Sequence, residues 1–268
     1  MTSTPLILGH RGASAVAPEN TLAAFSRAMD DGADGIEFDV RLSRDHVPVV
    51  IHDSTLERTG SSQRSIHELT AAELQEIDVG SWFTKSRSNS AVVSRSTSYS
   101  GEKLPTLAQV FNLFSSRSGM LYVELKCESN ERSYLATAVV KLIREYGIEN
   151  RVVVESFDLQ AIVEIKNNGA GIRTAALFEP KFSRPISTIR RLRMIDLALE
   201  HQADEIALHY TLVAPRVIEK AKQAGLDIVI WTVDDSKWIA RARSLGIKAL
   251  IANNPAAMVH SREMSDKL

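Results

Sequence analysis

The stretch Gly35-Ile-Glu-Phe-Asp-Val40 alternates apolar and acidic side chains, as a β-strand with two different faces does. Eight short β-rich runs recur along the chain, and helical patterns that end near a glycine separate most of them. This repeated alternation predicts an α/β fold, a closed parallel TIM (β/α)₈ barrel. The runs are Leu6–His10, Gly35–Val40, Leu121–Lys126, Arg151–Glu155, Ile172–Phe178, Glu205–His209, Asp227–Val233 and Lys248–Asn253.

The size of the chain fits one barrel. An α/β barrel takes about 250 residues, and the chain has 268, of which 44% are hydrophobic. We therefore expect residues 1–268 to form a single domain. An open, doubly wound sheet is the competing fold, but the glycine-rich nucleotide loop that it often carries is missing from the sequence.

Composition limits the kinds of binding partner and the cellular compartment to be expected. The 32 basic residues nearly balance the 33 acidic ones, so no basic surface for nucleic acid is indicated. The single cysteine, Cys127, excludes an internal disulfide framework and is compatible with a reducing compartment. We expect a cytoplasmic protein, because the N-terminus lacks a signal-peptide pattern and no apolar run approaches the ~18 residues of a membrane span. The sequence does not indicate an oligomeric state.

A ninth β-like run, Val47–Ile51, follows the second strand too closely for a parallel return. It therefore predicts an antiparallel hairpin with a turn around residues 43–46. A turn centred there places Asp39 opposite His52 and brings His52 to the end of the second barrel strand. The segment 54–103 that follows is predicted to be an insertion. It contains a helix signal at Ala71–Ile77 and a polar loop at Ser86–Ser100, which is either a disordered excursion or a lid over the pocket.

Acidic residues gather on the inner face of the predicted barrel. The outer face of each strand packs on helices, so Glu37 and Asp39 must point inward, as must Glu124 with Lys126. Three neighbouring carboxylates repel one another, and a divalent cation, Mg²⁺ or Ca²⁺, would remove that repulsion. The alternative is a set of buried ion pairs, with Lys126, Arg11 and Arg41 as the cations.

Two histidines are expected at the rim of the barrel. His10 ends the first strand, and the hairpin delivers His52 to the same rim. Two histidines beside a cationic centre can supply one proton and remove another near neutral pH. Arg11 and Lys126 suit the non-bridging oxygens of a phosphoryl group. Trp231 points inward by alternation and is expected to form a pocket wall. The residues thus predict metal-assisted chemistry on a small anion, with a phosphate ester favoured.

These residues closely resemble one family, the glycerophosphodiester phosphodiesterases. The resemblance extends from residue 6 to about residue 255, and the order and spacing of its motifs together are specific for this family. They are His10-Arg11-Gly12, Pro18-Glu-Asn-Thr21, Glu37-Phe-Asp39, His52-Asp53, Glu124-Leu-Lys126, Ser156-Phe157, Leu177-Phe178 and Trp231-Thr-Val233.

The resemblance implies a TIM barrel and hydrolysis of glycerophosphodiesters to sn-glycerol 3-phosphate and an alcohol. It also implies a set of roles, namely a divalent cation held by Glu37, Asp39 and Glu124, acid–base catalysis by His10 and His52, and phosphate contacts from Arg11 and Lys126. One position departs from the family pattern. Asn253 stands where an aspartate is expected after the last strand, at an edge that could contact a glycerol hydroxyl.

Other functions remain as alternatives. A lysophospholipase D would place a lipid tail in a pocket shaped by the insertion and Trp231. A Schiff-base aldolase could use Lys126, although adjacent carboxylates should keep that amine protonated. A non-catalytic phosphate-ester binding barrel has no use for two rim histidines. An amidohydrolase-type barrel usually needs His-x-His on its first strand, and Gly9-His10-Arg11 does not provide it.

Overall fold

The structure, a computed structural model, describes residues 4–83, 98–180 and 188–266. Eight parallel strands form one closed barrel, because the first and second strands also pair with each other. Their order around the barrel is β1-β9-β8-β7-β6-β5-β4-β2. All eight predicted strands are confirmed to within two residues. They are β1 (Leu6–His10), β2 (Gly35–Leu42), β4 (Met120–Leu125), β5 (Val152–Ser156), β6 (Arg173–Phe178), β7 (Glu205–His209), β8 (Asp227–Trp231) and β9 (Ala249–Ala252).

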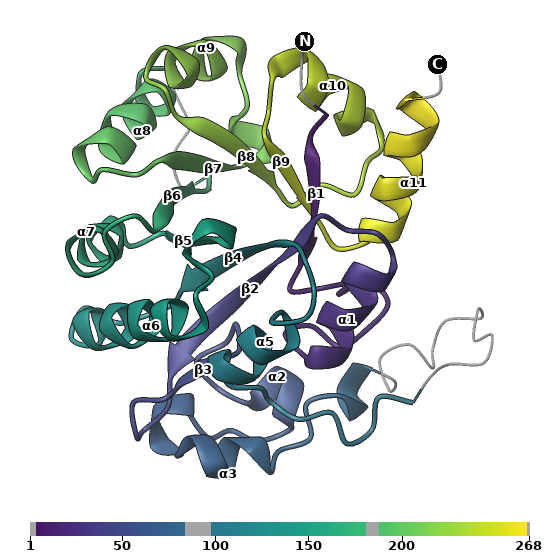
Figure 1. Ribbon diagram of the computed structural model, residues 1–268, viewed down its shortest axis with the longest axis vertical. Helices are drawn as coiled ribbons and strands as arrows, with labels where there is room; N and C mark the ends of the chain where they lie inside the picture. The colour runs from purple at the N-terminus through teal and green to yellow at the C-terminus, as the bar shows by residue number, and fades with distance from the viewer. Residues whose placement is uncertain (1–3, 84–97, 181–187, 267–268) are drawn as a thin grey trace.

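Helices surround the barrel strands on the outside (Figure 1). Local signals set their ends: the Thr21 hydroxyl accepts from the main-chain N–H of Ala24 to begin α1, and α6 ends at Gly147 in the left-handed conformation. The longer helices are α1 (Leu22–Asp30), α5 (Leu107–Leu113), α6 (Arg132–Tyr146), α7 (Leu159–Asn168), α8 (Thr188–Glu200), α9 (Pro215–Gln223), α10 (Lys237–Leu245) and α11 (Pro255–Asp266). Among the described helices, none is both long and apolar enough to cross a bilayer.

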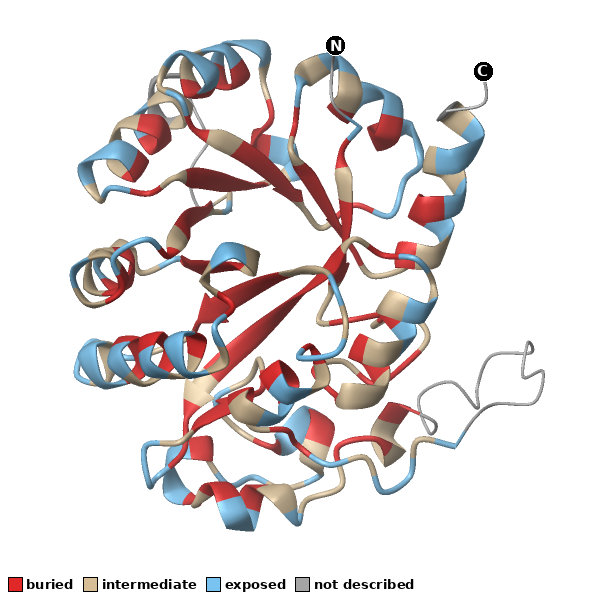
Figure 2. Ribbon diagram, in the orientation of Figure 1, coloured by how far each residue is buried: buried red, intermediate tan, exposed pale blue. Residues whose placement is uncertain are grey.

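The core has an outer and an inner part. Most buried residues lie where outward strand faces meet the helices, and the strands are buried almost throughout (Figure 2). A smaller apolar cluster fills the barrel interior. It consists of Leu8, Tyr122, Val153, Ala175, Leu177, Ala207, Val229, Ala249 and Ile251. Because several of these residues are alanines, the interior leaves space for polar groups and a pocket.

The predicted hairpin forms, but its register differs by one residue. β3 (Pro48–Val50) pairs antiparallel with β2, with Val40 opposite Val50, and the N–H of Ile51 donates to the carbonyl of Asp39. The predicted pairing of Asp39 with His52 is therefore wrong. The cause is a three-residue loop, 44–46, which ends at His46 in the left-handed conformation with φ of +59°.

Beyond the hairpin, the insertion packs on β3 at one end of the molecule (Figure 1). It contains α2 (Glu57–Gly60), α3 (Ala71–Gln75) and a 3₁₀ turn at Ile66–Glu68. Other 3₁₀ turns lie outside the insertion, at Glu149–Arg151 and Tyr210–Leu212. Apolar residues of the insertion form a small core with Leu104 and the hairpin residues Val49 and Ile51: Leu56, Ile66, Leu69, Ala71, Leu74 and Val79. Most of the predicted loop Ser86–Ser100 lies outside the described residues.

Candidate active site

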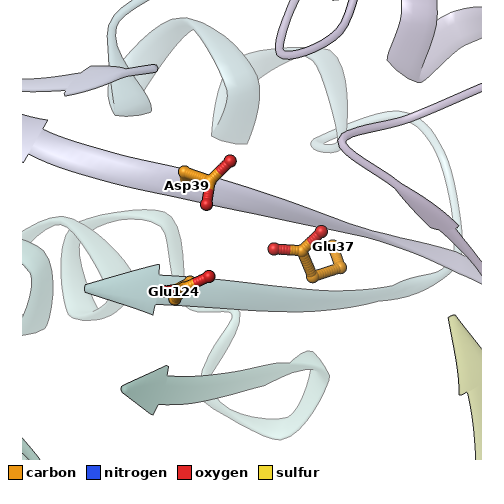
Figure 3. A group of neighbouring side chains, drawn as sticks. All are labelled: Glu37, Asp39 and Glu124. Carbon is orange, nitrogen blue, oxygen red and sulfur yellow. The ribbon is translucent and has the colours of Figure 1, made fainter. Parts of the chain in front are cut away.

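Three carboxyl groups meet inside the barrel on the neighbouring strands β2 and β4. Glu37 and Asp39 come from β2 and Glu124 from β4, and Asp39 pairs in register with Glu124. One oxygen of each residue lies within 4.8 Å of an oxygen of both others, and all three residues are buried. Figure 3 shows the three carboxylates gathered around the space between the strands. The predicted acidic cluster is thus formed.

Two cationic side chains enter this cluster. Lys126 Nζ lies 2.6 Å from Glu124 and 3.3 Å from Asp39, and Arg11 Nε lies 3.1 Å from Asp39. Asp39 also accepts a 2.8 Å hydrogen bond from the amide of Asn20. Burial opposes ionisation of Asp39, but Arg11 and Lys126 hold its pKa well below the usual value. The ion pairs therefore keep Asp39 ionised, whereas Lys126 offsets the burial of Glu124 only in part.

Glu37 is less well compensated. It accepts a 3.1 Å hydrogen bond from the main-chain N–H of Arg11, and His10 Nε2 lies 3.9 Å away. Burial, followed by the charges of Asp39 and Glu124, raises the pKa of Glu37 well above its usual value. Burial and the charge of Asp39 also raise the pKa of Glu124 to about 7. Protons offset part of the repulsion in this cluster when no cation is bound.

This donor set fits a hard divalent cation. Buried carboxylate oxygens are the ligands that Mg²⁺ and Ca²⁺ prefer, and a cation would replace the protons that the raised pKa values imply. Arg41, expected as another counter-ion, instead donates from Nε to the carbonyl of His52 at 2.8 Å. The cluster therefore keeps one more carboxylate than it has nearby Lys or Arg partners.

His10 ends β1, and its ring is held from one side. His10 Nδ1 lies 2.7 Å from Asn253 Oδ1. The Asn253 amide has a defined orientation, because its Nδ2 donates to the carboxylate of Asp234 at 2.8 Å. His10 Nδ1 therefore carries the proton, and Nε2 is the nitrogen nearer Glu37. Burial, with the charge of Arg11, lowers the pKa of His10 to about 4.

His52 follows β3 and reaches the same pocket despite the shifted register. Its Nδ1 lies 2.6 Å from Asp53 Oδ1, and Asp53 accepts a 2.7 Å hydrogen bond from Arg58 Nε. Because a carboxylate accepts from Nδ1–H, Nε2 of His52 is left to act elsewhere. Burial is the largest influence on His52 and lowers its pKa, although Asp39 and Asp53 oppose that shift.

The loop after β1 adopts an uncommon backbone that presents Arg11. Arg11 and Asn20 both have left-handed φ values, +53° and +58°, and the N–H of Asn20 donates to the carbonyl of Arg11. Gly12, at φ +82°, packs so tightly that an added Cβ would lie 2.6 Å from the backbone of Ala24. Glu19 braces Arg11 through a 2.8 Å ion pair.

Both histidines, Arg11, Lys126 and two of the three clustered carboxylates line one pocket of about 110 Å³ at the mouth of the barrel. Trp231 forms part of its wall, as predicted, and Phe157 packs edge-on against the Trp231 ring at 5.6 Å. His209 contacts the Trp231 ring in a similar way at 5.3 Å. The full lining comprises His10, Arg11, Glu37, His52, Glu124, Lys126, Glu155, Phe157, Leu177, Glu179, Trp231 and Ile251. The sequence pattern did not single out Glu155 or Glu179 as pocket residues.

The chain is similar to known proteins over nearly its whole length. The profile of the "Glycerophosphoryl diester phosphodiesterase family" matches residues 10–257. The chain is 30% identical over 255 residues to the glycerophosphodiester phosphodiesterase of Caldanaerobacter subterraneus subsp. tengcongensis, covering 95% of this chain and 96% of that protein. A glycerophosphodiester phosphodiesterase from Agrobacterium tumefaciens is similar in structure, with a TM-score of 0.75, 25% identity and coverage of 96% and 99%. A phosphodiesterase from Oleispira antarctica, solved in complex with the product sn-glycerol-3-phosphate, has the same fold, with a TM-score of 0.82, 24% identity and 97% coverage of each chain.

Proposed function

This chain belongs to the glycerophosphoryl diester phosphodiesterase family, and we propose that it hydrolyses glycerophosphodiesters to sn-glycerol 3-phosphate and an alcohol with a divalent cation. The observation that carries this proposal is the meeting of an acidic cluster, two histidines and two cationic side chains in one barrel mouth. The sn-glycerol-3-phosphate complex of the Oleispira antarctica phosphodiesterase supports the choice of product.

Glu37, Asp39 and Glu124 would hold the cation, Mg²⁺ or Ca²⁺. When bound, the cation supplies positive charge that stabilises the phosphoryl group in the transition state. Arg11 and Lys126 line the same pocket and would bind the non-bridging phosphate oxygens. Their ion pairs with the carboxylates fix both side chains in place before the substrate arrives, so little ordering is needed on binding.

His10 and His52 would transfer the protons. His10 is held with its proton on Nδ1, so the lone pair on Nε2 can accept a proton from the water that attacks phosphorus. The Asp53 carboxylate behind His52 stabilises the imidazolium form, which suits His52 to donate a proton to the leaving oxygen. We therefore assign His10 as the general base and His52 as the general acid in the step that releases the alcohol.

The pocket favours a water-soluble substrate over a lipid tail. Its volume of about 110 Å³ is small, and eight of its twelve lining residues carry a carboxylate, imidazole or cationic group. Schiff-base chemistry at Lys126 is disfavoured too. Burial opposes its charge, but Glu124 and Asp39 raise the pKa of Lys126, so the amine stays protonated.

We also propose that residues 1–268 act as one catalytic domain in which the insertion, 54–103, supports the pocket mouth. The contacts of Arg58 with Glu19 and Asp53, the partners of Arg11 and His52, support this role. The near balance of basic and acidic residues and the single cysteine support a cytoplasmic enzyme without a nucleic-acid partner. Cell fractionation followed by immunoblotting tests the location.

A panel assay tests the proposed activity. Purified protein is incubated with glycerophosphodiesters that carry choline, ethanolamine or glycerol as the alcohol, and release of sn-glycerol 3-phosphate is measured. We expect turnover with Mg²⁺ or Ca²⁺, loss of turnover in EDTA, and recovery on adding the metal back. Absence of hydrolysis across the metal-supplied panel, or full activity in EDTA after dialysis, would contradict the proposal.

A further inference from the structure

Two glutamates from nearby strands lie inside the barrel and differ in their hydrogen bonds among the described residues. Glu155 on β5 and Glu205 on β7 are in register through Ala175 of β6. Glu205 accepts hydrogen bonds from Tyr122 at 2.8 Å and from Lys248 at 2.5 Å. Glu155 is 1% exposed, and its Oε2 has no hydrogen-bond partner among the residues that the structure describes. Glu205 has an evident structural role, whereas Glu155 does not.

A second unpaired polar atom belongs to Trp231, which lines the same pocket as Glu155. Trp231 Nε1 is buried and also lacks a hydrogen-bond partner within the described part of the chain. Buried polar atoms are nearly always paired in native proteins, because leaving one unpaired is costly. An acceptor and a donor without partners, beside the apolar residues Leu177 and Ile251, form a surface that complements hydroxyl groups on a short carbon chain.

We propose that Glu155, together with the indole N–H of Trp231, binds the hydroxyl groups of the glycerol part of the substrate. The inference rests on the proposed function and adds a residue that determines specificity. A carboxyl oxygen accepts a hydroxyl proton whether or not the group is ionised, and the hydroxyl oxygen can accept from an indole N–H. A pocket built in this way disfavours an analogue without hydroxyls, because its own polar atoms then stay unpaired.

The other charged groups of the pocket are assigned to the phosphate and to the metal, and not to the glycerol hydroxyls. The phosphate oxygens belong near Arg11 and Lys126, since a carboxylate repels them. Among the described residues, the cluster with oxygens within 4.8 Å of one another contains Glu37, Asp39 and Glu124 but not Glu155. Glu155 therefore lies in the same pocket as the reacting groups, but it is assigned neither to phosphate binding nor to metal binding.

Binding of two phosphate monoesters tests the inference. sn-Glycerol 3-phosphate and n-propyl phosphate share a three-carbon chain and a phosphate but differ in their hydroxyls. Both are titrated by calorimetry into the Mg²⁺-loaded protein, as wild type, Glu155→Gln and Glu155→Met. We expect wild type to prefer sn-glycerol 3-phosphate. Glu155→Met should lose between about fivefold and a hundredfold of that preference, the range of one or two hydrogen bonds, with propyl phosphate affinity little changed. Glu155→Gln, which keeps an acceptor, should retain most of it.

Thermal unfolding separates a binding role from a structural one. Glu155→Met loses no protein hydrogen bond at Oε2, so its Tm should equal or exceed that of wild type. Glu205→Met breaks several contacts and should lower Tm. Equal loss of affinity for both monoesters in Glu155→Met, unchanged preference, or a specific fall in Mg²⁺ affinity would overturn the inference while leaving the proposed function intact. Failure of wild type to bind either monoester would overturn both.

Discussion

Asn253 Oδ1 lies 2.7 Å from His10 Nδ1, and the Asn253 amide is itself fixed by Asp234, so two residues behind His10 determine which ring nitrogen carries the proton. We predict that Asn253→Ala lowers kcat by about tenfold to a hundredfold with a smaller change in KM, as loss of an orienting partner usually does. Asn253→Asp keeps an acceptor and should restore much of kcat.

The pH profile distinguishes orientation from a general packing defect. A carboxylate at position 253 would favour the charged form of His10, so the acidic limb of the kcat/KM profile should move to higher pH in Asn253→Asp. Asn254→Ala is the matched control, because Asn254 Oδ1 accepts from the N–H of Ala257 at the start of α11 and makes no bond to His10. Equal losses in Asn253→Ala and Asn254→Ala would contradict a specific role for Asn253.

Substitution of the acidic cluster should separate metal binding from folding. Glu37→Gln and Glu124→Gln each remove a ligand and a buried repulsion, so Mg²⁺ affinity and activity should fall at least tenfold while the metal-free Tm is kept or raised. Asp39→Asn should also lower Tm, because breaking its buried pairs with Arg11 and Lys126 costs about 3–5 kcal/mol.

Calorimetric Mg²⁺ titration and thermal unfolding provide the two measurements. Glu179→Gln serves as the control, since Glu179 is an exposed carboxylate of the pocket rim outside the acidic cluster. Unchanged Mg²⁺ affinity in all three cluster variants would remove the metal assignment.

Metal affinity should depend on pH around neutrality. The pKa of Glu124 is raised to about 7, so Glu124 carries a proton in part below pH 7 and releases it above pH 7. Burial and the neighbouring carboxylates raise the pKa of Glu37 as well. Since a carboxylate binds Mg²⁺ in its ionised form, affinity should rise from pH 6 to pH 8, by about tenfold per pH unit on the acidic side for one displaced proton.

Titrations at pH 6, 7 and 8 in buffers with different ionisation enthalpies report both the affinity and the protons released. The same experiment on Glu124→Gln should show a weaker pH dependence, because one of the titrating ligands is gone. A wild-type affinity that stays constant from pH 6 to 8 would mean that the ligands are already ionised throughout.

The sequence was sufficient where a pattern is local. The alternation of apolar and acidic residues alone predicts that Glu37 and Asp39 point into the barrel, since the strand face that packs on the helices must be apolar. It failed at the hairpin, because one left-handed residue, His46, sets a three-residue loop that shifts every pair beyond it. It also could not reveal the bond between His10 and Asn253, which lie 243 positions apart and meet only when the barrel closes. Asn253 departs from the family pattern, and the closed barrel shows that it contacts His10.

The insertion reaches the catalytic groups through Arg58, and this contact gives the last prediction. Arg58 donates to Asp53 at 2.7 Å and to both oxygens of Glu19, at 2.7 and 2.8 Å, while those carboxylates hold His52 and Arg11. Arg58→Gln should leave both carboxylates freer to move and lower kcat/KM by about tenfold or more. The kcat/KM of Arg58→Lys should lie between those of wild type and Arg58→Gln, because an ammonium group cannot bridge two carboxylates as a planar guanidinium does.

The effect should appear in activity more than in stability. Arg58 is 41% exposed, and ion pairs at such positions contribute about 1 kcal/mol or less to the free energy of unfolding. Arg64→Gln is a suitable control, because Arg64 is an exposed arginine of the same insertion that bonds Ser62 and Leu56 through its main chain. Steady-state kinetics and chemical denaturation on the three variants decide the matter. If Arg58→Gln keeps full kcat/KM, or loses activity only in proportion to a fall in stability, the insertion acts as packing alone and His52 and Arg11 are held in place by the barrel itself.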